Sequence, residues 1–303
     1  MLELGLRRLG QARAPRRRAF RRLALALLGI VTLTVAGAGS VLHAADAKLR
    51  VVATLPDPFI LTRAVAGDLA TIDVIARFGQ NPHDMEVRPS HILLVRRADV
   101  LVRNGLEEDA WIDVMVHSAA NPRVLRGSAG VVEAAQGLTV LKVLAGRVDR
   151  SMGDVHPSGS PHYTLDPDNV AIVTANIAAG LTRAFPEQAR AFETNRQTFL
   201  EKVAEADRRW KAALAPFRGS ALVSYHDSWP YFYRAFGFIE GGTIEDRPGI
   251  PPSPQHLASL IRAMREQKVK ASSTRVGIRP TSPAGSRGRP APRWSWSRSH
   301  RAP

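Results

Sequence analysis

Three histidines lie in loop-like segments, each within a few residues of an acid. His83 occurs in Asn-Pro-His-Asp, His162 in Pro-His-Tyr-Thr-Leu-Asp, and His226 in Tyr-His-Asp directly after an apolar segment. Neutral imidazole is a common zinc ligand, and three imidazoles with one oxygen give the tetrahedral coordination that zinc prefers. A nearby acid could accept the second ring N–H and fix the tautomer. The acids in question are Asp84, Asp166 and Asp227.

Sequence spacing alone does not show that these histidines converge. His83 and His162 are 79 residues apart, and 64 residues separate His162 from His226. The chain has no His-Glu-x-x-His motif, cysteine pair, Walker loop or Gly-x-Ser-x-Gly element, so no compact signature of a metalloprotease, nucleotide-binding protein or serine hydrolase is present. For each histidine a solvated loop residue is the ordinary alternative. The fold must bring the three together.

Strand-like and helix-like segments alternate in the first half of the chain. A β-branched, apolar segment at 49–55 is closed by Pro56, and a second one at 100–103 ends at Asn-Gly. Such alternation predicts βαβ units with a mainly parallel sheet, an α/β fold. Ligand sites in such sheets form outside the carboxyl ends of the strands. The other elements expected here are a strand at 71–77, helices at 58–69, 90–98 and 111–119, and an extended segment beginning at Val124.

The second half begins with a long helical region at 167–215, which Pro186 interrupts. A helix over 186–215 would be about 45 Å long at 1.5 Å per residue, enough to run beside two domains. We interpret it as a connecting helix between two α/β lobes. The strand 221–224 and helices near 229–235 and 254–268 follow it. The predicted organisation is an N-terminal lobe at 48–185, the connecting helix at 186–215 and a C-terminal lobe at 216–271, with a surface loop at 138–161.

The basic charge of the chain is confined to its two ends. Of the formal net charge of +15, residues 1–47 contribute +6 and residues 272–303 contribute +7, which leaves +2 for residues 48–271. A folded body with so small a charge lacks the basic face of a typical nucleic-acid-binding protein. We therefore expect no nucleic-acid partner.

The N-terminal segment is typical of an export signal. Arginines precede an apolar stretch from Leu23 to Leu42, and Ala45 and Ala47 fit a cleavage site. Residues 1–47 are predicted to be a cleavable signal peptide, the alternative being a retained membrane anchor. The chain has no cysteine, so any metal must be held by His, Asp or Glu, and no cysteine is available for a lipid anchor. A periplasmic location is predicted.

At these same residues the chain resembles the zinc and manganese solute-binding proteins of bacterial metal ABC transporters. The resemblance covers about residues 49–271 and rests on motifs that occur in the family's order. They are Val51-Val52-Ala53-Thr54, Asn81-Pro82-His83-Asp84-Met85-Glu86, Ala98-Asp99-Val100 through Asn104-Gly105-Leu106-Glu107 to Trp111, Pro161-His162-Tyr163 with Leu165-Asp166-Pro167, Tyr225-His226-Asp227, and Pro252-Ser253-Pro254.

The resemblance implies a fold, a function and a ligand set. Its members have two α/β lobes joined by a rigid helix, bind metal between the lobes as monomers, and pass it to a membrane ABC permease without enzymatic chemistry. It implies that His83, His162 and His226 are metal ligands, and histidine at the third position favours zinc over manganese. His156 is an expected auxiliary metal-collecting residue or a solvated loop histidine.

The C-terminal segment departs from the family pattern. Residues 272–303 contain no Asp, Glu, Leu or Phe and are rich in Arg, Pro, Ser and Gly, which predicts a disordered basic tail. We hypothesise that a reading-frame shift near residue 271 replaced the native end; a basic nucleic-acid-binding arm is the alternative. The second lobe is then incomplete and lacks the family's acidic fourth ligand. The candidate substitutes are Glu86, Asp227 and His156.

Two other functions stay open from the sequence. A zinc-dependent hydrolase could use the three histidines with a bound water, and a truncated product could have no function. The remaining histidines are expected at the surface of helices or outside the folded body. They are His91, His117 and His256 on predicted helices, and His43 and His300 at the ends.

Overall fold

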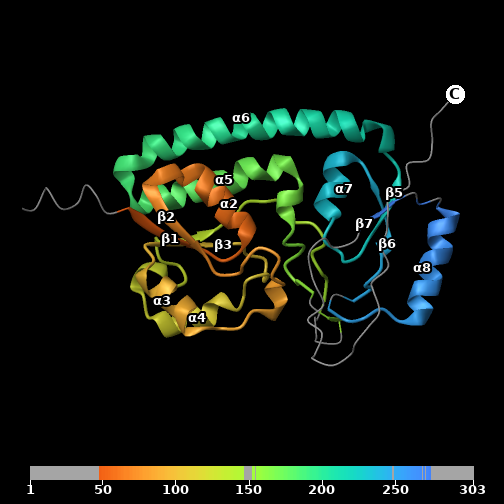
Figure 1. Cartoon of the computed structure of the whole chain (residues 1–303), viewed down its shortest axis with the longest axis horizontal. Coiled ribbons are helices and arrows are strands. Elements are labelled where there is room, and N and C mark those ends of the chain that lie inside the picture. The colour runs from red at the N-terminus through yellow and green to blue at the C-terminus, as the bar shows by residue number, and fades with distance from the viewer. Residues whose placement is uncertain are drawn as a thin grey trace, which may run out of the picture.

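The predicted apolar strand at the start of the folded body forms β1 (Leu49–Ala53), in the middle of a parallel sheet. The computed structural model describes residues 48–146, 152–153, 155–247, 249–267, 269 and 271–273. Within them two separate parallel sheets are flanked by helices (Figure 1), which confirms the α/β class. The first sheet has the order β2-β1-β3-β4, with β2 (Ala70–Val74), β3 (Val100–Arg103) and β4 (Val131–Glu133). The second has the order β6-β5-β7, with β5 (Ala221–Ser224), β6 (Ile239–Thr243) and β7 (Ala271–Ser273).

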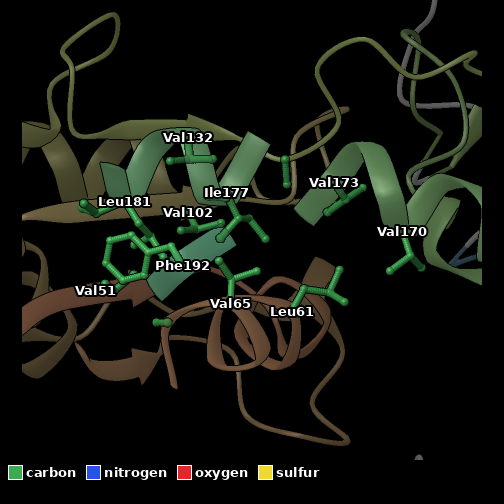
Figure 2. Close-up of a cluster of buried hydrophobic side chains, with 14 of the residues drawn as sticks. Val51, Leu61, Val65, Val102, Val132, Val170, Val173, Ile177, Leu181 and Phe192 are labelled. Carbon is green, nitrogen blue, oxygen red and sulfur yellow. The ribbon is translucent and has the colours of Figure 1, made fainter. Parts of the chain in front are cut away.

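The first sheet is covered by helices on both faces, so its strands are apolar on both sides. Val51 of β1 points into one buried cluster and the next residue, Val52, into another. The first cluster packs against α2 (Pro56–Ala66) and α5 (Pro167–Ala184), as Figure 2 shows. The second packs against α3 (Pro89–Arg97) and α4 (Ile112–Ala119). This three-layer core fixes the strand ends from which the candidate site is built.

A long helix runs along one side of the molecule, past both sheets (Figure 1). It is α6 (Ala189–Leu214), with a length of about 39 Å at 1.5 Å per residue. A short turn at Pro186–Gln188 separates it from α5, as the proline predicted. Phe192 anchors its first half in the core of the first sheet and is fully buried. The expected long helix is therefore present, while the lobe boundaries at 48–185 and 216–271 stay predictions.

Three elements differ from the sequence-based expectation. The segment that starts at Val124 is not extended, because Pro122–Val124 form a 3-10 turn and the strand comes later, at β4. The strand β6 was not predicted, because its two glycines weaken the strand pattern, but pairing with β5 imposes the extended form. The strand β7 crosses the predicted start of the disordered tail at residue 272 and pairs with β5.

The second lobe also contains two further helices, α7 (Pro230–Phe236) and α8 (Pro254–Glu266). The predicted signal peptide at 1–47 and the rest of the tail, 274–303, lie outside the described residues. Among the helices that are described, none combines the length and the apolar character needed to cross a membrane.

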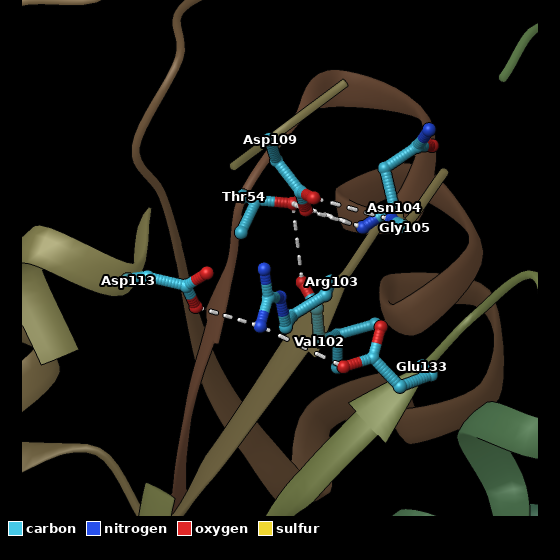
Figure 3. Close-up of polar contacts among 8 residues, drawn as sticks. All are labelled: Thr54, Val102, Arg103, Asn104, Gly105, Asp109, Asp113 and Glu133. Carbon is cyan, nitrogen blue, oxygen red and sulfur yellow. Dashed lines mark hydrogen bonds and ion pairs between the residues drawn. The ribbon is translucent and has the colours of Figure 1, made fainter. Parts of the chain in front are cut away.

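A buried polar network joins the carboxyl ends of β1 and β3 (Figure 3). The Asp109 carboxylate is completely buried and accepts hydrogen bonds from the Thr54 hydroxyl at 2.6 Å and from the Asn104 backbone N–H at 2.7 Å. It also accepts the Gly105 N–H at 3.2 Å. These three hydrogen bonds replace those that the carboxylate and the three donors would make with water. The loop between Asn104 and Asp109 is thereby held in one conformation.

Removing this carboxylate should destabilise the protein more than removing an exposed one. Asp109→Ala removes the shared acceptor of two backbone N–H groups and a hydroxyl, leaves Thr54 and Asn104 with only their longer hydrogen bonds to Val102 and Thr54, and opens a cavity, so the free energy of unfolding is expected to fall by about 3 kcal/mol. Urea unfolding followed by circular dichroism measures it. The control Asp68→Ala changes an exposed side chain and should alter stability by about 0.5 kcal/mol at most. Equal effects of the two substitutions would contradict the structural role of the network.

Candidate metal centre

His83 lies in the loop that follows the carboxyl end of β2. The turn Pro82–Asp84 begins at Asn81, whose side-chain oxygen accepts a hydrogen bond from the His83 backbone N–H at 3.3 Å. Asn81 also donates through its side-chain amide to Asp84 at 2.7 Å. The proline fixes the backbone and the asparagine closes the turn on both sides of the histidine. The imidazole is consequently mostly buried, with its side chain 15% exposed.

His162 is positioned by the residues on either side of it. The Pro161 carbonyl accepts a hydrogen bond from the Asn104 side-chain amide at 3.3 Å. The Tyr163 hydroxyl donates to the Asn104 backbone carbonyl at 2.9 Å, and its ring is almost fully buried. Asn104, whose backbone N–H donates to Asp109, therefore links the Asp109 network to the segment that contains His162. Burial lowers the pKa of His162 to about 4, with the Glu108 carboxylate acting in the opposite direction. The imidazole is neutral at pH 7 and keeps a lone pair for a ligand.

His226 lies just beyond the carboxyl end of β5 and is 6% exposed. Its Nδ1 atom is 3.1 Å from the Oε2 atom of Glu245, which follows β6 on the neighbouring strand. A carboxylate only accepts, so Nδ1 carries the proton in this contact and Nε2 retains its lone pair. Glu245 thus orients the His226 ring and selects the tautomer that is able to bind a metal through Nε2.

The fold brings the three predicted histidines into one cluster. Ring centroids are 6.4 Å apart for His83 and His226 and 6.1 Å apart for His162 and His226. Two imidazoles on one tetrahedral zinc, with bonds of about 2 Å, have centroids about 5 Å apart. The observed spacing is slightly wider, by an amount that small side-chain rotations can close. His83 and His226 follow the carboxyl ends of β2 and β5, as expected for open α/β sheets, while His162 lies just before the turn that leads into α5.

Two further residues join the cluster at His83. The Nε2 atom of His83 is 3.9 Å from Oε2 of Glu108, and Nε2 of His156 is 2.9 Å from the same oxygen. Potential ligand atoms of all three residues lie within 4.8 Å of one another, a geometry able to hold a metal ion. Burial alone would raise the pKa of Glu108, but contact with His156 and the potential of the surrounding histidines lower it to about 2. Glu108 is accordingly ionised at neutral pH.

The acids expected to pair with the histidines have other partners. Asp84 accepts from Asn81, and Asp166 accepts from Arg234 through two nitrogens at 2.7 and 3.0 Å. Asp227 lies 3.6 Å from Lys142. The acids one to four residues away in sequence make other contacts, while the acid that contacts His226, Glu245, comes from the segment just after the neighbouring strand β6. The prediction of sequence-local partners was therefore wrong, because the tautomer-fixing contact is tertiary.

The three residues considered as substitutes for a fourth ligand lie in different places. Glu86 has an 82% exposed side chain that faces Arg88 and lies outside the cluster. His156 contacts Glu108 in the cluster, and Asp227 lies 3.6 Å from Lys142 in the cavity of about 220 Å³ that His156, His162 and His226 also line. Glu108 was not predicted, since a second acid in Glu107-Glu108-Asp109 reads as an exposed charge run. The signal in the sequence was its position just after a strand that ends in Asn-Gly.

The other histidines are placed as follows. His117 on α4 is exposed, as expected. His91 on α3 is partly buried, and burial lowers its pKa. His256 on α8 is partly buried too, with Nε2 2.8 Å from the Thr243 carbonyl. These two differ from the expected surface histidines, because α3 and α8 turn these faces toward the body of their own lobes. His43 and His300 are outside the described part of the chain.

Comparison with known proteins places this geometry in context. The sequence profile of the family described as zinc-uptake complex component A, periplasmic, matches residues 51–282. The zinc-binding protein AdcA of Streptococcus pyogenes serotype M6 is 25% identical over 234 residues, which is 75% of this chain and 45% of AdcA. The chain thus spans about half the length of that relative. The manganese ABC transporter substrate-binding lipoprotein PsaA of Streptococcus mitis is 25% identical over 80% of this chain and 77% of PsaA.

Solved structures share the fold. The solute-binding protein FpvC from Pseudomonas aeruginosa in complex with Mn²⁺ superposes with a TM-score of 0.64 at 24% identity, covering 78% of this chain and 83% of FpvC. A crystal structure of ZnuA gives a TM-score of 0.60 at 22% identity, over 73% of this chain and 80% of that one. The profile match extends over about three quarters of the sequence, and the chain therefore belongs to the periplasmic zinc-uptake component A family.

Proposed function

We propose that this protein captures a divalent transition metal, zinc in preference to manganese, and delivers it to a membrane ABC permease. The observation that carries the proposal is the convergence of His83, His162 and His226 from three separate loops. The metal is the cargo, and the three imidazoles are its ligands. Capture outside the cytoplasm follows if residues 1–47 act as a cleavable signal peptide and release the chain into the periplasm as a monomer.

The chemistry of the donors supports zinc as the preferred ion. Imidazole-rich sites suit zinc, while manganese favours sites rich in oxygen ligands. The low pKa of His162 keeps that imidazole neutral at pH 7, and the contact of His226 Nδ1 with Glu245 directs the Nε2 lone pair of His226 toward a ligand. The names of the relatives point to both metals, because AdcA is a zinc-binding protein and PsaA belongs to a manganese transporter.

A transport role fits better than the hydrolase alternative. Members of the matched family are described as components of a zinc-uptake complex. A protein with that role needs a metal-binding site but no catalytic step. A truncated product without function is the remaining alternative, and metal binding by the purified protein distinguishes it from a competent one.

The first test is the loss of metal binding when the three histidines are removed together. His83→Ala, His162→Ala and His226→Ala in one variant should weaken zinc binding by about 1,000-fold or more, equivalent to about 4 kcal/mol. Isothermal titration in competition with a chelator measures the affinity. The control His117→Ala removes an exposed histidine of α4 and should bind as the unmodified protein does. Unchanged affinity in the triple variant would rule out the three-histidine site.

Delivery is tested in cells of the source organism. Loss of the gene should slow growth in zinc-depleted medium, and the unmodified gene, but not the triple-histidine variant, should restore it. Restoration by both genes would show that uptake does not depend on this site.

Metal preference follows from the donor set. In direct competition zinc should bind about 100-fold more tightly than manganese, because imidazole ligands and the general order of divalent-metal affinities both favour zinc. Displacement of one ion by the other, read by elemental analysis after dialysis, provides the ratio. Tighter binding of manganese would reverse the assignment of the cargo.

The contact between Glu245 and His226 makes a separate prediction. Glu245→Gln removes the carboxylate that fixes the imidazole tautomer and should weaken zinc binding by about 10- to 100-fold, the usual effect of losing such a partner. Isothermal titration in competition with a chelator measures the change in zinc affinity. Asp246→Asn, which alters the exposed neighbouring acid, serves as the control. If both substitutions leave the affinity unchanged, Glu245 does not orient the ligand.

A further inference from the structure

Glu108 is a buried carboxylate whose near neighbours are imidazoles. Its side chain is 5% exposed, and among the described residues its ion pairs are with His156 at 2.9 Å and His83 at 3.9 Å. No hydrogen bond of acceptable geometry reaches its Oε2 atom in the described structure, and the same holds for both ring nitrogens of His156. The oxygen therefore faces a group of nitrogen donors without being satisfied by any of them.

Such an arrangement is costly unless a cation occupies it. A buried carboxylate needs an opposite charge or several hydrogen bonds, and the imidazoles that face Glu108 make no hydrogen bond of acceptable geometry to its Oε2 atom. Lys142, a cationic side chain beside the cluster, is instead engaged by Glu240 at 2.7 Å and Asp227 at 3.6 Å. A divalent ion would satisfy the carboxylate and the imidazoles together, since carboxylate oxygen and imidazole nitrogen are both zinc ligands.

The geometry is suited to a shared ion. The potential ligand atoms of His83, Glu108 and His156 lie within 4.8 Å of one another. Donors bound to one ion at about 2 Å are separated by about 3 to 4 Å, so only small adjustments are needed. His83 belongs both to this group and to the three-histidine cluster, being 6.4 Å from His226 between ring centroids. One ion at His83 is thus within reach of Glu108.

We propose that Glu108 is the carboxylate ligand of the captured ion, completing a three-histidine, one-carboxylate set with His83, His162 and His226. This inference rests on the proposed function, because it assigns a fourth ligand to the same site. The ligand comes from the loop between β3 and α4 of the first lobe, and the buried Asp109 carboxylate next to it holds that loop. With Glu108 bound, one negative charge offsets part of the ion's double charge in a partly buried site.

The test compares Glu108→Gln with the matched control Glu107→Gln. Glu107 is the neighbouring acid, and its carboxylate accepts a hydrogen bond from the Ser158 hydroxyl at 2.6 Å. Glu108→Gln should weaken zinc binding by about 100-fold or more. Glu107→Gln should change the affinity by about twofold at most, because an acid that does not bind the ion affects it only through the screened electrostatic potential. Glu108→Asp, which retains a carboxylate on a shorter stem, should recover part of the lost affinity.

Cobalt provides a readout that a purely structural role of Glu108 would not change. The visible absorption of bound Co²⁺ depends on its ligands, so Glu108→Gln should alter the band positions or intensities and Glu107→Gln should not. Glu108→Gln with unchanged zinc affinity and an unchanged cobalt spectrum would overturn the inference. The triple-histidine variant in the same titrations tells the two proposals apart: if it loses binding while Glu108→Gln does not, the metal site stands and only its fourth ligand is wrong.

Discussion

The candidate site depends on the buried carboxylate of Asp109. It binds the backbone N–H groups that follow β3 and the Thr54 hydroxyl that follows β1, and thereby fixes the loop that carries Glu108. Asn104, a member of the same network, receives the Tyr163 hydroxyl and donates to the Pro161 carbonyl on either side of His162. One buried carboxylate therefore positions two of the segments that carry the candidate ligands, the Glu108 loop and the His162 segment. Such a network favours a single geometry, because any other arrangement would leave a buried polar group without a hydrogen-bond partner and cost free energy.

Leu141 and Ser160, together with α7, connect this network to the second lobe. The Tyr231 hydroxyl donates to the Ser160 carbonyl at 3.0 Å and accepts the Leu141 N–H at 3.2 Å. Asp166, at the start of α5, receives two hydrogen bonds from Arg234 of α7. These contacts hold His226 and Glu245 of the second lobe opposite His83 and Glu108 of the first. A metal ligated from both sides would link the lobes further, a way in which binding can be coupled to their arrangement.

Much of this architecture could be predicted from sequence, and the failures have physical causes. Apolar β-branched segments and the proline at residue 186 predicted β1, β3, β5 and the long helix α6, because these signals are local. The strand β6 contains two glycines and takes its form from pairing with β5. The partner of His226 was missed for the same reason: Glu245 is 19 residues away in the chain and becomes its neighbour because β5 and β6 pair and end side by side. The resemblance to a metal-binding family pointed to His83, His162 and His226 as candidate ligands, whereas their convergence depends on a tertiary arrangement that sequence spacing cannot show.

The most direct measurement is X-ray absorption spectroscopy of the zinc-loaded protein. The account predicts a first shell of nitrogen and oxygen at about 2.0 to 2.1 Å, with the outer-shell scattering of three imidazole rings. A zinc ion with at most one imidazole, surrounded mainly by water or carboxylate oxygen, would contradict it.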